Sequence, residues 1–176
     1  GWNIPDIVGL CEIEGPEAVE LLLRRGRLRR YYEGLCFPTS DGRGIATAML
    51  YRKDRVEVLH SQAIVTSSPE RRFFTRDILY AKIAVFRDTF HIFVNHWPSK
   101  RGGGNKSDAL RDTVAFQLKQ FVDSVLDVSS KANVIIMGDF NDSETSACLT
   151  SVLGTSNDAS FSGDNSSKYL FNLSTL

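Results

Sequence analysis

Apolar and polar positions along the chain follow a pattern that predicts several short strands. Residues 4–10 form a β-branched apolar run, which predicts a buried strand leading into Cys11 and Glu12. Comparable runs predict strands at residues 45–51, 56–59, 79–86, 90–94 and 133–137. Because only residues 87–89 separate two of these runs, we expect a hairpin with antiparallel pairing there.

A helical pattern begins after the first predicted strand. Pro16 and Glu17 stand where a helix would start. The arginine-rich run 24–30 is interpreted as the solvated end of this helix, with a functional basic patch as the alternative. The apolar face of the helix would consist of Ala18, Val19, Leu21, Leu22 and Leu23.

The second half of the chain predicts a longer helix. Apolar residues recur at helical spacing over residues 107–128, with Ser107 as the N-cap. Residues 143–153 favour a short helix capped by Asp142. The Ser-, Asn-, Asp- and Gly-rich stretch 154–168 favours a loop.

Strands at hairpin spacing, interrupted by two or three helices, indicate an α/β fold with antiparallel or mixed sheets. Within residues 90–94, Phe90, Ile92 and Val94 share one face of the strand and Phe93 lies on the other. Both faces are therefore apolar, which predicts two packed sheets with outer helices.

Composition narrows the classes of protein without selecting a partner. A chain of 176 residues is expected to form a single domain. Lys+Arg and Asp+Glu both number 21, so any affinity for a polyanion must come from a local patch. No apolar run approaches the roughly 20 residues of a membrane span, and the composition is ordinary for a soluble globular protein.

The three cysteines define neither a disulfide framework nor a metal site. Cys11, Cys36 and Cys148 show no C-x-x-C spacing, so they indicate neither disulfides nor a zinc site and are interpreted as small buried hydrophobes. No signal-peptide pattern is present. Because the sequence opens on Gly1 and not on Met, the removal of a secretion signal is kept as an alternative. Compartment and oligomeric state are left undetermined.

Polar groups follow three of the predicted strands. They are Glu12 after the first, Asn95 and His96 after residues 90–94, and Asp139 after residues 133–137. A carboxylate beside an apolar strand is costly unless it is paired, hydrogen-bonded or ligated. Converging strand ends are rigid mounts on which sheet proteins often build sites.

Four stretches resemble, in order, motifs of the endonuclease/exonuclease/phosphatase family, the deoxyribonuclease I-like superfamily. The resemblance covers nearly the whole chain and implies a four-layer α/β sandwich, divalent-metal-dependent hydrolysis of phosphoesters and an active site at the sheet ends. The stretches are Pro5-Asp-Ile-Val-Gly-Leu-Cys-Glu12, Arg76-Asp-Ile-Leu, Asn95-His-Trp-Pro-Ser-Lys-Arg101 and Gly138-Asp-Phe-Asn-Asp142.

The resemblance implies roles for four residues. Glu12 matches the metal-binding glutamate, which would hold Mg²⁺, with Mn²⁺ as a second candidate. His96 matches a histidine that contacts the phosphate. Asp139 would orient or deprotonate the attacking water, and the Asn141 amide would hold the phosphate. The alternatives are a surface glutamate, a structural histidine and ordinary Asx-turn chemistry.

A second group of residues is expected to bind the phosphate or the rest of the substrate. Arg76 matches a family position near the phosphate, although a solvated surface arginine is the alternative. Asn95 would either contact substrate or orient His96. A basic, glycine-rich rim is expected around the site, formed by Ser99, Lys100, Arg101 and Arg111.

The leading hypothesis is a metal-dependent phosphodiesterase or nuclease, with a phosphoester substrate and nucleic acid as one candidate. The rival is a module on the same fold that has lost catalysis and binds a phosphorylated ligand or partner. The fold alone does not determine which of the family's substrates this protein would cleave. The Asn-His-Trp-Pro-Ser form favours a nuclease slightly, although charge is balanced and Trp97 is the only large aromatic beside the predicted site.

The resemblance is incomplete at both ends. The family's site also uses an asparagine on an earlier strand and a C-terminal Asp-His pair, and no histidine follows His96. We therefore expect this single domain, 1–176, to lack its first strand and its C-terminal strands. Unpaired sheet edges would make these residues alone inactive and prone to aggregation, whereas the parent protein would be active.

Overall fold

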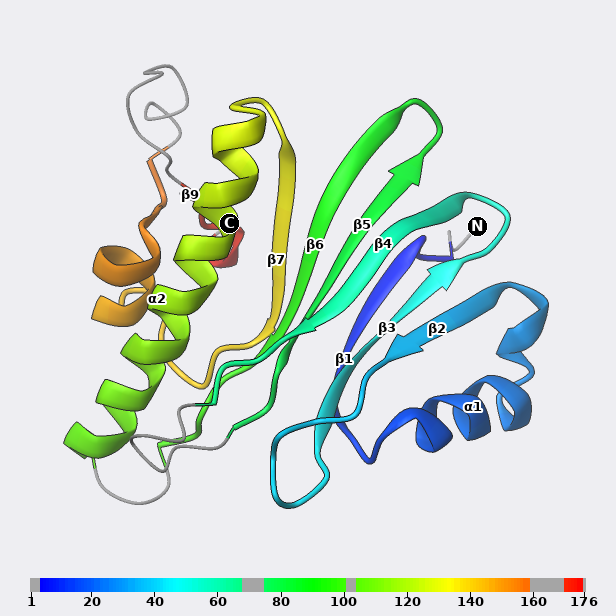
Figure 1. The fold of residues 1–176 in the computed structure, drawn as a ribbon, viewed down its shortest axis with the longest axis horizontal. Helices are drawn as coiled ribbons and strands as arrows, with labels where there is room; N and C mark the ends of the chain where they lie inside the picture. The colour runs from blue at the N-terminus through cyan, green and yellow to red at the C-terminus, as the bar shows by residue number, and fades with distance from the viewer. Residues whose placement is uncertain (1–3, 68–74, 101–103, 159–169, 176) are drawn as a thin grey trace. The chain divides into compact units, whose positions relative to one another are not determined.

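The computed structural model describes residues 4–67, 75–100, 104–158 and 170–175. The chain divides into two compact units. The first consists of Gly1–His96 with Ala132–Asp139, and the second of Trp97–Lys131 with Phe140–Leu176. The elements are those of a mixed α/β protein with two multi-stranded sheets, as the sequence predicts (Figure 1).

The first sheet of unit 1 has the strand order β1–β3–β2 and is antiparallel throughout. Its strands are β1 (Ile7–Ile13), β2 (Tyr32–Cys36) and β3 (Ala46–Arg52). Helix α1 (Pro16–Arg25) packs on one face through Val19 and Leu23. A Cβ on Gly34 would lie 2.5 Å from the Val19 side chain, so the helix approaches this closely only over a glycine.

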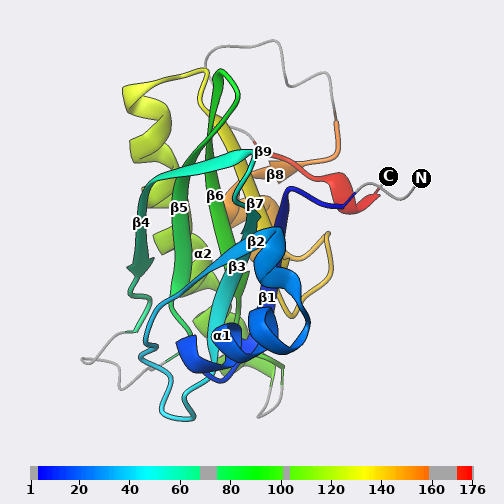
Figure 2. The same ribbon diagram turned by 90° about the vertical axis from the view of Figure 1, so that its right-hand side faces the viewer.

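The second sheet of unit 1 has the order β4–β5–β6–β7 (Figure 2). Its strands are β4 (Val56–Ile64), β5 (Ile78–Val85), β6 (Asp88–His96) and β7 (Asn133–Asp139). The first three pair antiparallel, whereas β6 and β7 run parallel.

The two sheets enclose the main core of unit 1. Met49 of β3 packs against Leu79 and Ile83 of β5 and against Ile92 and Val94 of β6. Phe93, on the opposite face of β6, is also fully buried. Both faces of this strand are therefore covered, which confirms the prediction made from its apolar pattern.

Unit 2 contains the long helix α2 (Gly104–Val128) and a short π-helix, Cys148–Leu153, that packs on it. Two short strands, β8 (Thr155–Ser156) and β9 (Leu170–Phe171), pair in parallel. A 3-10 turn follows at Leu173–Thr175. Within the described residues, no helix combines the length and apolar character that a membrane span requires.

Several predicted boundaries were wrong in unit 1. Strand β1 continues through Glu12, and β7 includes Gly138 and Asp139 and is only partly buried. The β5–β6 turn comprises residues 86–87, because pairing already begins at Asp88. Strand β2 was not predicted. Leu21 and Leu22, expected on the buried face of α1, are each 40% exposed.

Two predictions in unit 2 also need correction. Helix α2 begins at Gly104, so Ser107 is buried within its first turns and is not the N-cap. No helix starts at Ser143, and the helical segment there is confined to Cys148–Leu153. Asp142 accepts a hydrogen bond from the backbone N–H of Ser143, but its carboxylate serves ion pairs instead of a helix cap.

Candidate active site

Strands β6 and β7 bring two of the predicted site residues together. They run parallel, so their carboxyl ends meet at one edge of the sheet, where His96 stands opposite Asp139. The His96 Nε2 and Asp139 Oδ2 atoms are 3.9 Å apart. The histidine side chain is 6% exposed and the aspartate side chain 53%, so solvent reaches the carboxylate and hardly reaches the imidazole.

The backbone of this edge depends on a glycine. Gly138 has φ +127°, and a Cβ at this position would lie 2.0 Å from the Asn95 carbonyl oxygen. Asn95 itself is fully buried, and its amide donates to the carbonyls of Phe93 (3.2 Å) and Met137 (3.4 Å). These contacts favour a supporting role for Asn95 over direct contact with substrate.

Glu12 lies in a β-bulge of β1, which corrects its predicted position beyond the strand end. Leu10 pairs with Ala48 and Ile13 with Ala46, so Cys11 and Glu12 together face one residue of β3. Glu12 has φ 58°, and its side chain is exposed. The Cys11 thiol donates to the Asn95 carbonyl at 3.3 Å, which joins this bulge to the end of β6.

A buried arginine supports the histidine from the other side. Arg76 is 7% exposed, and its Nε donates to the His96 carbonyl at 3.1 Å. Its Nη1 lies 3.6 Å from the buried carboxylate of Asp41, which also pairs with Arg43. Arg76 therefore lies beside His96, and sequence analysis assigned no role to the Asp41 and Arg43 side chains that accompany it.

The electrostatic environment of His96 favours the neutral imidazole. Burial lowers the pKa of His96, and the charge of Arg76 lowers it further. The negative charges of Asp139 and Glu12 oppose this shift without cancelling it. The buried Nδ1 atom of His96 makes no hydrogen bond within the described residues. A buried imidazole nitrogen without a partner departs from the usual pairing of buried polar groups and marks His96 as a candidate functional residue.

Asn141 and Asp142 belong to unit 2. Asn141 has φ 51°, a left-handed conformation that asparagine tolerates, and its Nδ2 donates to the Trp97 carbonyl at 3.0 Å. Asp142 binds Arg111 Nε at 2.9 Å and Lys100 Nζ at 2.7 Å. The predicted phosphate ligand Lys100 is thus engaged in an ion pair.

Two side chains around the expected rim, Arg111 of the rim itself and the neighbouring Trp97, are buried. Arg111 has no exposed surface, so its assignment to a basic rim was wrong. Trp97 is also fully buried and meets Phe140 edge-on with ring centroids 5.0 Å apart, so its ring cannot stack on a base. Ser99 is half-buried, and Arg101 lies outside the described residues.

A metal ion fits this site only in an open, largely hydrated form. The described residues contain no group of three or more His, Cys, Asp or Glu side chains that could cage an ion. Glu12 nevertheless offers an exposed carboxylate that pairs with no Lys or Arg in the described part of the chain. Mg²⁺ prefers hard oxygen ligands and retains several waters, so one carboxylate is sufficient for it.

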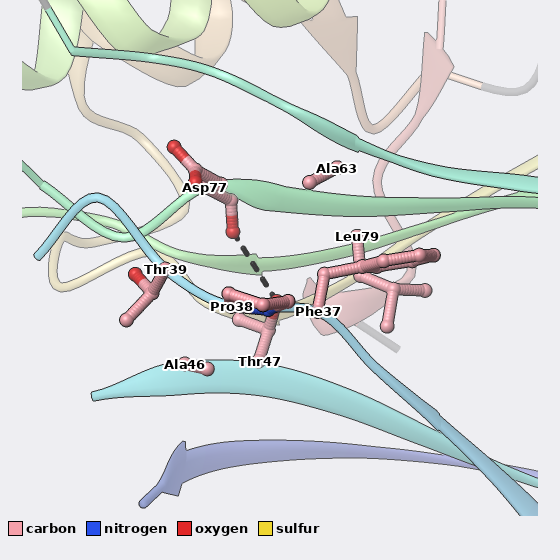
Figure 3. Close-up of a pocket in the computed structure, with 8 residues that line it drawn as sticks. All are labelled: Phe37, Pro38, Thr39, Ala46, Thr47, Ala63, Asp77 and Leu79. Carbon is pink, nitrogen blue, oxygen red and sulfur yellow. Dashed lines mark hydrogen bonds between the residues drawn. The ribbon is translucent and has the colours of Figure 1, made fainter. Parts of the chain in front are cut away.

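The cysteines and a small pocket add no further chemistry. All three cysteines are free, and burial raises the pKa of each thiol. A pocket lies between β3 and β5, where Thr47 donates to the Asp77 carbonyl at 3.2 Å (Figure 3). Its free volume, about 10 Å³, matches a single water molecule and excludes a substrate.

Comparison with known proteins identifies relatives of this fold. The sequence model of the endonuclease/exonuclease/phosphatase family matches residues 2–175. No curated protein sequence matches the chain.

Solved structures match with modest sequence identity. The catalytic domain of human Nocturnin, with a bound sulfate anion, matches with a TM-score of 0.66 and 20% identity, over 85% of this chain and 58% of that one. D. rerio TDP2, complexed with a single-strand DNA product, matches with a TM-score of 0.61 and 25% identity. The match covers 85% of this chain and 52% of the TDP2 chain. ANGEL2, a 2′,3′-cyclic phosphatase, matches with a TM-score of 0.67 and 14% identity. The match covers 82% of this chain and 42% of the ANGEL2 chain. The chain thus spans 42–58% of the length of these structures.

Proposed function

The chain belongs to the endonuclease/exonuclease/phosphatase family, and we propose that it hydrolyses phosphoesters with the help of a divalent metal ion. The observation that carries this proposal is the pairing of His96 with Asp139 at the ends of two parallel strands, 3.9 Å apart. A buried neutral donor beside an exposed carboxylate is an arrangement suited to attack by water on a phosphorus centre.

Asp139 accepts the proton of the attacking water. Its side chain is half exposed, so water reaches it, and its position opposite His96 directs that water towards a phosphoryl group held by the imidazole. No cysteine or serine attacks the substrate, so the reaction has no covalent intermediate. This is consistent with the raised pKa of the Cys11 thiol, which burial keeps protonated.

His96 donates a hydrogen bond to a non-bridging phosphoryl oxygen as negative charge develops there. Arg76 positions the histidine through its hydrogen bond to the His96 carbonyl, and its positive charge adds to the stabilisation of the phosphoryl oxygens. As the family resemblance implies, the side-chain amide of Asn141 is the second candidate to hold a phosphoryl oxygen.

Glu12 holds the metal ion. A bound Mg²⁺, or Mn²⁺ in its place, would polarise the phosphoryl oxygens and stabilise the leaving oxyanion. The exposed carboxylate of Glu12 on its bulge binds the ion, and the Cys11 thiol ties that bulge to the end of β6.

A phosphodiester in a nucleic acid is the favoured substrate class. In support, one protein of similar fold, TDP2, is described in complex with a single-strand DNA product, and another, ANGEL2, as a 2′,3′-cyclic phosphatase. Trp97, the large aromatic noted beside the predicted site, is buried, which leaves backbone phosphate as the main feature to be recognised.

A substrate panel tests the proposal. The intact protein, stripped of metal and then supplied with Mg²⁺ or Mn²⁺, is offered bis-p-nitrophenyl phosphate, single-stranded DNA, RNA and an inositol phosphate. We expect metal-dependent turnover of the diesters. Cleavage of DNA should fall steeply between 50 and 200 mM salt if the phosphate backbone is bound. Metal-independent binding of phosphorylated ligands without turnover would instead support the rival binding module.

A further inference from the structure

An arginine-rich surface lies where α1 ends, on a part of unit 1 that the proposed mechanism does not use. Residues 24–31 contain five arginines and Tyr31 and no acidic residue. Lys53 of the β3–β4 turn joins this surface, because its Nζ donates to the Arg29 carbonyl at 2.8 Å and its N–H to the Tyr31 carbonyl at 3.1 Å. We call residues 24–31 and 52–55 the arginine patch.

The arginine patch keeps a net positive charge after the nearby carboxylates are counted. It contains eight Lys and Arg side chains. Five carboxylates lie within it, within two residues of it along the chain, or in an ion pair with it: Asp6, Glu20, Glu33, Asp54 and Glu57. Eight positive and five negative charges leave an excess of three positive charges. Such a local excess is what binding of a polyanion requires, because the chain as a whole is neutral.

Four arginines of the patch are exposed and form no ion pair with a carboxylate in the described ranges of the chain. They are Arg24, Arg25, Arg27 and Arg30. Arg30 lies over the ring of Tyr31, with its Cζ 5.5 Å from the ring centroid, and Tyr31 is itself 39% exposed. Guanidinium groups beside an exposed aromatic ring suit a single-stranded nucleic acid, because phosphates pair with the former and bases stack on the latter.

The backbone at Arg27 is a second, independent indication of a ligand. Arg27 follows the C-cap Gly26 of α1 and has φ 54°. Glycine usually occupies this left-handed position, because it has no Cβ, and arginine adopts it only with strain. Arg24 and Arg25 already complement the dipole in the last turn of the helix. The end of α1 therefore does not need a third arginine, and a strained residue without a local reason indicates a functional contact.

The arginine patch and Glu12 stand at opposite ends of the first sheet (Figure 1). Ile7 of β1 pairs with Tyr51, the residue before Arg52. The steps along β1 from Ile7 to Glu12 correspond to roughly 17 Å at about 3.4 Å per residue. A strand of a nucleic-acid helix advances about 3.4 Å per nucleotide, so at least about five nucleotides separate the two places.

We propose that the arginine patch binds the backbone of a single-stranded nucleic acid, with the Tyr31 ring stacked on a base. A functional basic patch at residues 24–30 was the alternative to a solvated helix end. The excess charge, the Arg30–Tyr31 contact and the strain at Arg27 favour that alternative. The inference deepens the proposed function and rests on it for one consequence, namely that only strands longer than about five nucleotides reach both the patch and the active site.

Equilibrium binding in EDTA tests the patch without any hydrolysis. Fluorescein-labelled oligo(dT) of about 20 nucleotides is titrated with the intact protein at several salt concentrations. Wild type is compared with a triple variant that combines Arg24→Gln, Arg27→Gln and Arg30→Gln. We expect the slope of log K against log salt to fall by about 2, from three lost phosphate contacts at roughly 0.7 each, and the affinity to fall at least about tenfold. An unchanged slope and affinity would overturn the proposal.

Lys82→Gln is the control for net charge. The neighbours of Lys82 on β5, Ala81 and Ile83, face the core between the two sheets, so Lys82 lies on the other face of the second sheet. Helix α1 packs through Val19 and Leu23 on the face of the first sheet that is turned away from that core. Lys82 and the patch are thus on opposite sides of unit 1, and this substitution should leave slope and affinity within about twofold of wild type.

Arg27→Gly separates binding from stability. The substitution relieves the left-handed strain, so its melting temperature should equal or exceed that of wild type, while the salt slope should fall by about 0.7. A higher melting temperature with unchanged binding would assign the arginines to the solvated end of the helix and refute the patch.

Tyr31→Ala tests the choice of nucleic acid over other polyanions. Inorganic polyphosphate and vesicles that contain phosphatidylserine offer negative charge but no base. The variant should bind oligo(dT) roughly fivefold or more weakly and should bind polyphosphate as wild type does. A nucleic-acid site is contradicted if wild type binds polyphosphate or vesicles as tightly as oligo(dT), or if Tyr31→Ala leaves oligo(dT) binding unchanged.

Metal-dependent turnover distinguishes this inference from the proposed function. With Mg²⁺ present, the triple variant should have a lower kcat/KM for the long oligonucleotide and a kcat/KM for bis-p-nitrophenyl phosphate within about twofold of wild type, because the small substrate does not reach the patch. Equal losses on both substrates would count against the patch. If wild type hydrolyses neither substrate, the proposed hydrolysis fails, and the titrations in EDTA still decide the patch.

Discussion

Arg111 donates its Nε hydrogen to Asp142 Oδ2 at 2.9 Å, although the arginine side chain has no exposed surface. The same guanidinium donates to the Pro98 carbonyl at 3.1 Å and pairs with Asp108. One side chain of α2 thus holds the segment that follows β6 and the segment that follows β7, directly beside Asn141.

Arg111→Met should destabilise the protein strongly. The substitution keeps the volume of the side chain but leaves the largely buried Asp142 with Lys100 as its remaining ion pair within the described residues. Breaking a buried ion pair costs about 3–5 kcal/mol of the free energy of unfolding. Urea denaturation measures this loss. Arg25→Met, at an exposed position of α1, should change the same quantity by less than about 0.5 kcal/mol. Equal effects of the two substitutions would contradict this role for Arg111.

The ion pairs of Asp142 should make stability depend on acid pH. Burial alone would raise the pKa of Asp142, but the Lys100 hydrogen bond, the Ser143 N–H and the charge of Arg111 lower it below its ordinary value of 3.8. The native state therefore binds this proton less readily than the unfolded state. The stabilisation is complete above pH 3.8 and is lost as pH falls through the lowered native pKa.

Asp142→Asn isolates that contribution. The difference in free energy of unfolding between wild type and this variant should be largest at pH 7 and should shrink as pH falls below 3.8, where wild type also loses the charge. Urea denaturation at a series of pH values provides the measurement. A difference that stays constant down to pH 2 would show that the carboxylate charge contributes nothing.

Gly138→Ala should disrupt the edge that carries Asp139. The new Cβ would meet the Asn95 carbonyl oxygen at 2.0 Å, a backbone atom fixed by the parallel pairing of β6 and β7, and φ is +127°. We expect a loss of at least about 3 kcal/mol of the free energy of unfolding. Gly42→Ala is the control, because no atom lies within 4 Å of its added Cβ. The account of this strand end fails if both alanines are tolerated alike.

Most strands were predictable because their apolar residues alternate or run continuously. Strand β6, with Ile92, Phe93 and Val94 all buried, is the clearest case. Strand β2 was missed because Glu33 and Gly34 interrupt its pattern. Gly34 is explained only by its tertiary contact, since a Cβ there would strike Val19.

The candidate site was predictable in its strand-end residues and not in their supports. His96 and Asp139 follow apolar runs, which pointed to one sheet edge. The Asp41–Arg76 pair joins segments far apart in the sequence, and no local pattern reveals such a contact. Arg111 was expected at the surface because arginine usually is, and only its partners in unit 2 bury it.

The central claim is that Asp139 activates water for phosphoester hydrolysis. The most direct test is kcat/KM for bis-p-nitrophenyl phosphate, measured for metal-stripped intact wild type and Asp139→Asn at saturating Mg²⁺. We expect the variant to lose roughly 10²–10⁴-fold in kcat/KM while its urea unfolding stays close to wild type, because its half-exposed carboxylate contributes little to stability. An Asp139→Asn protein within about threefold of wild type, or a folded wild type with no metal-dependent turnover, would contradict the claim.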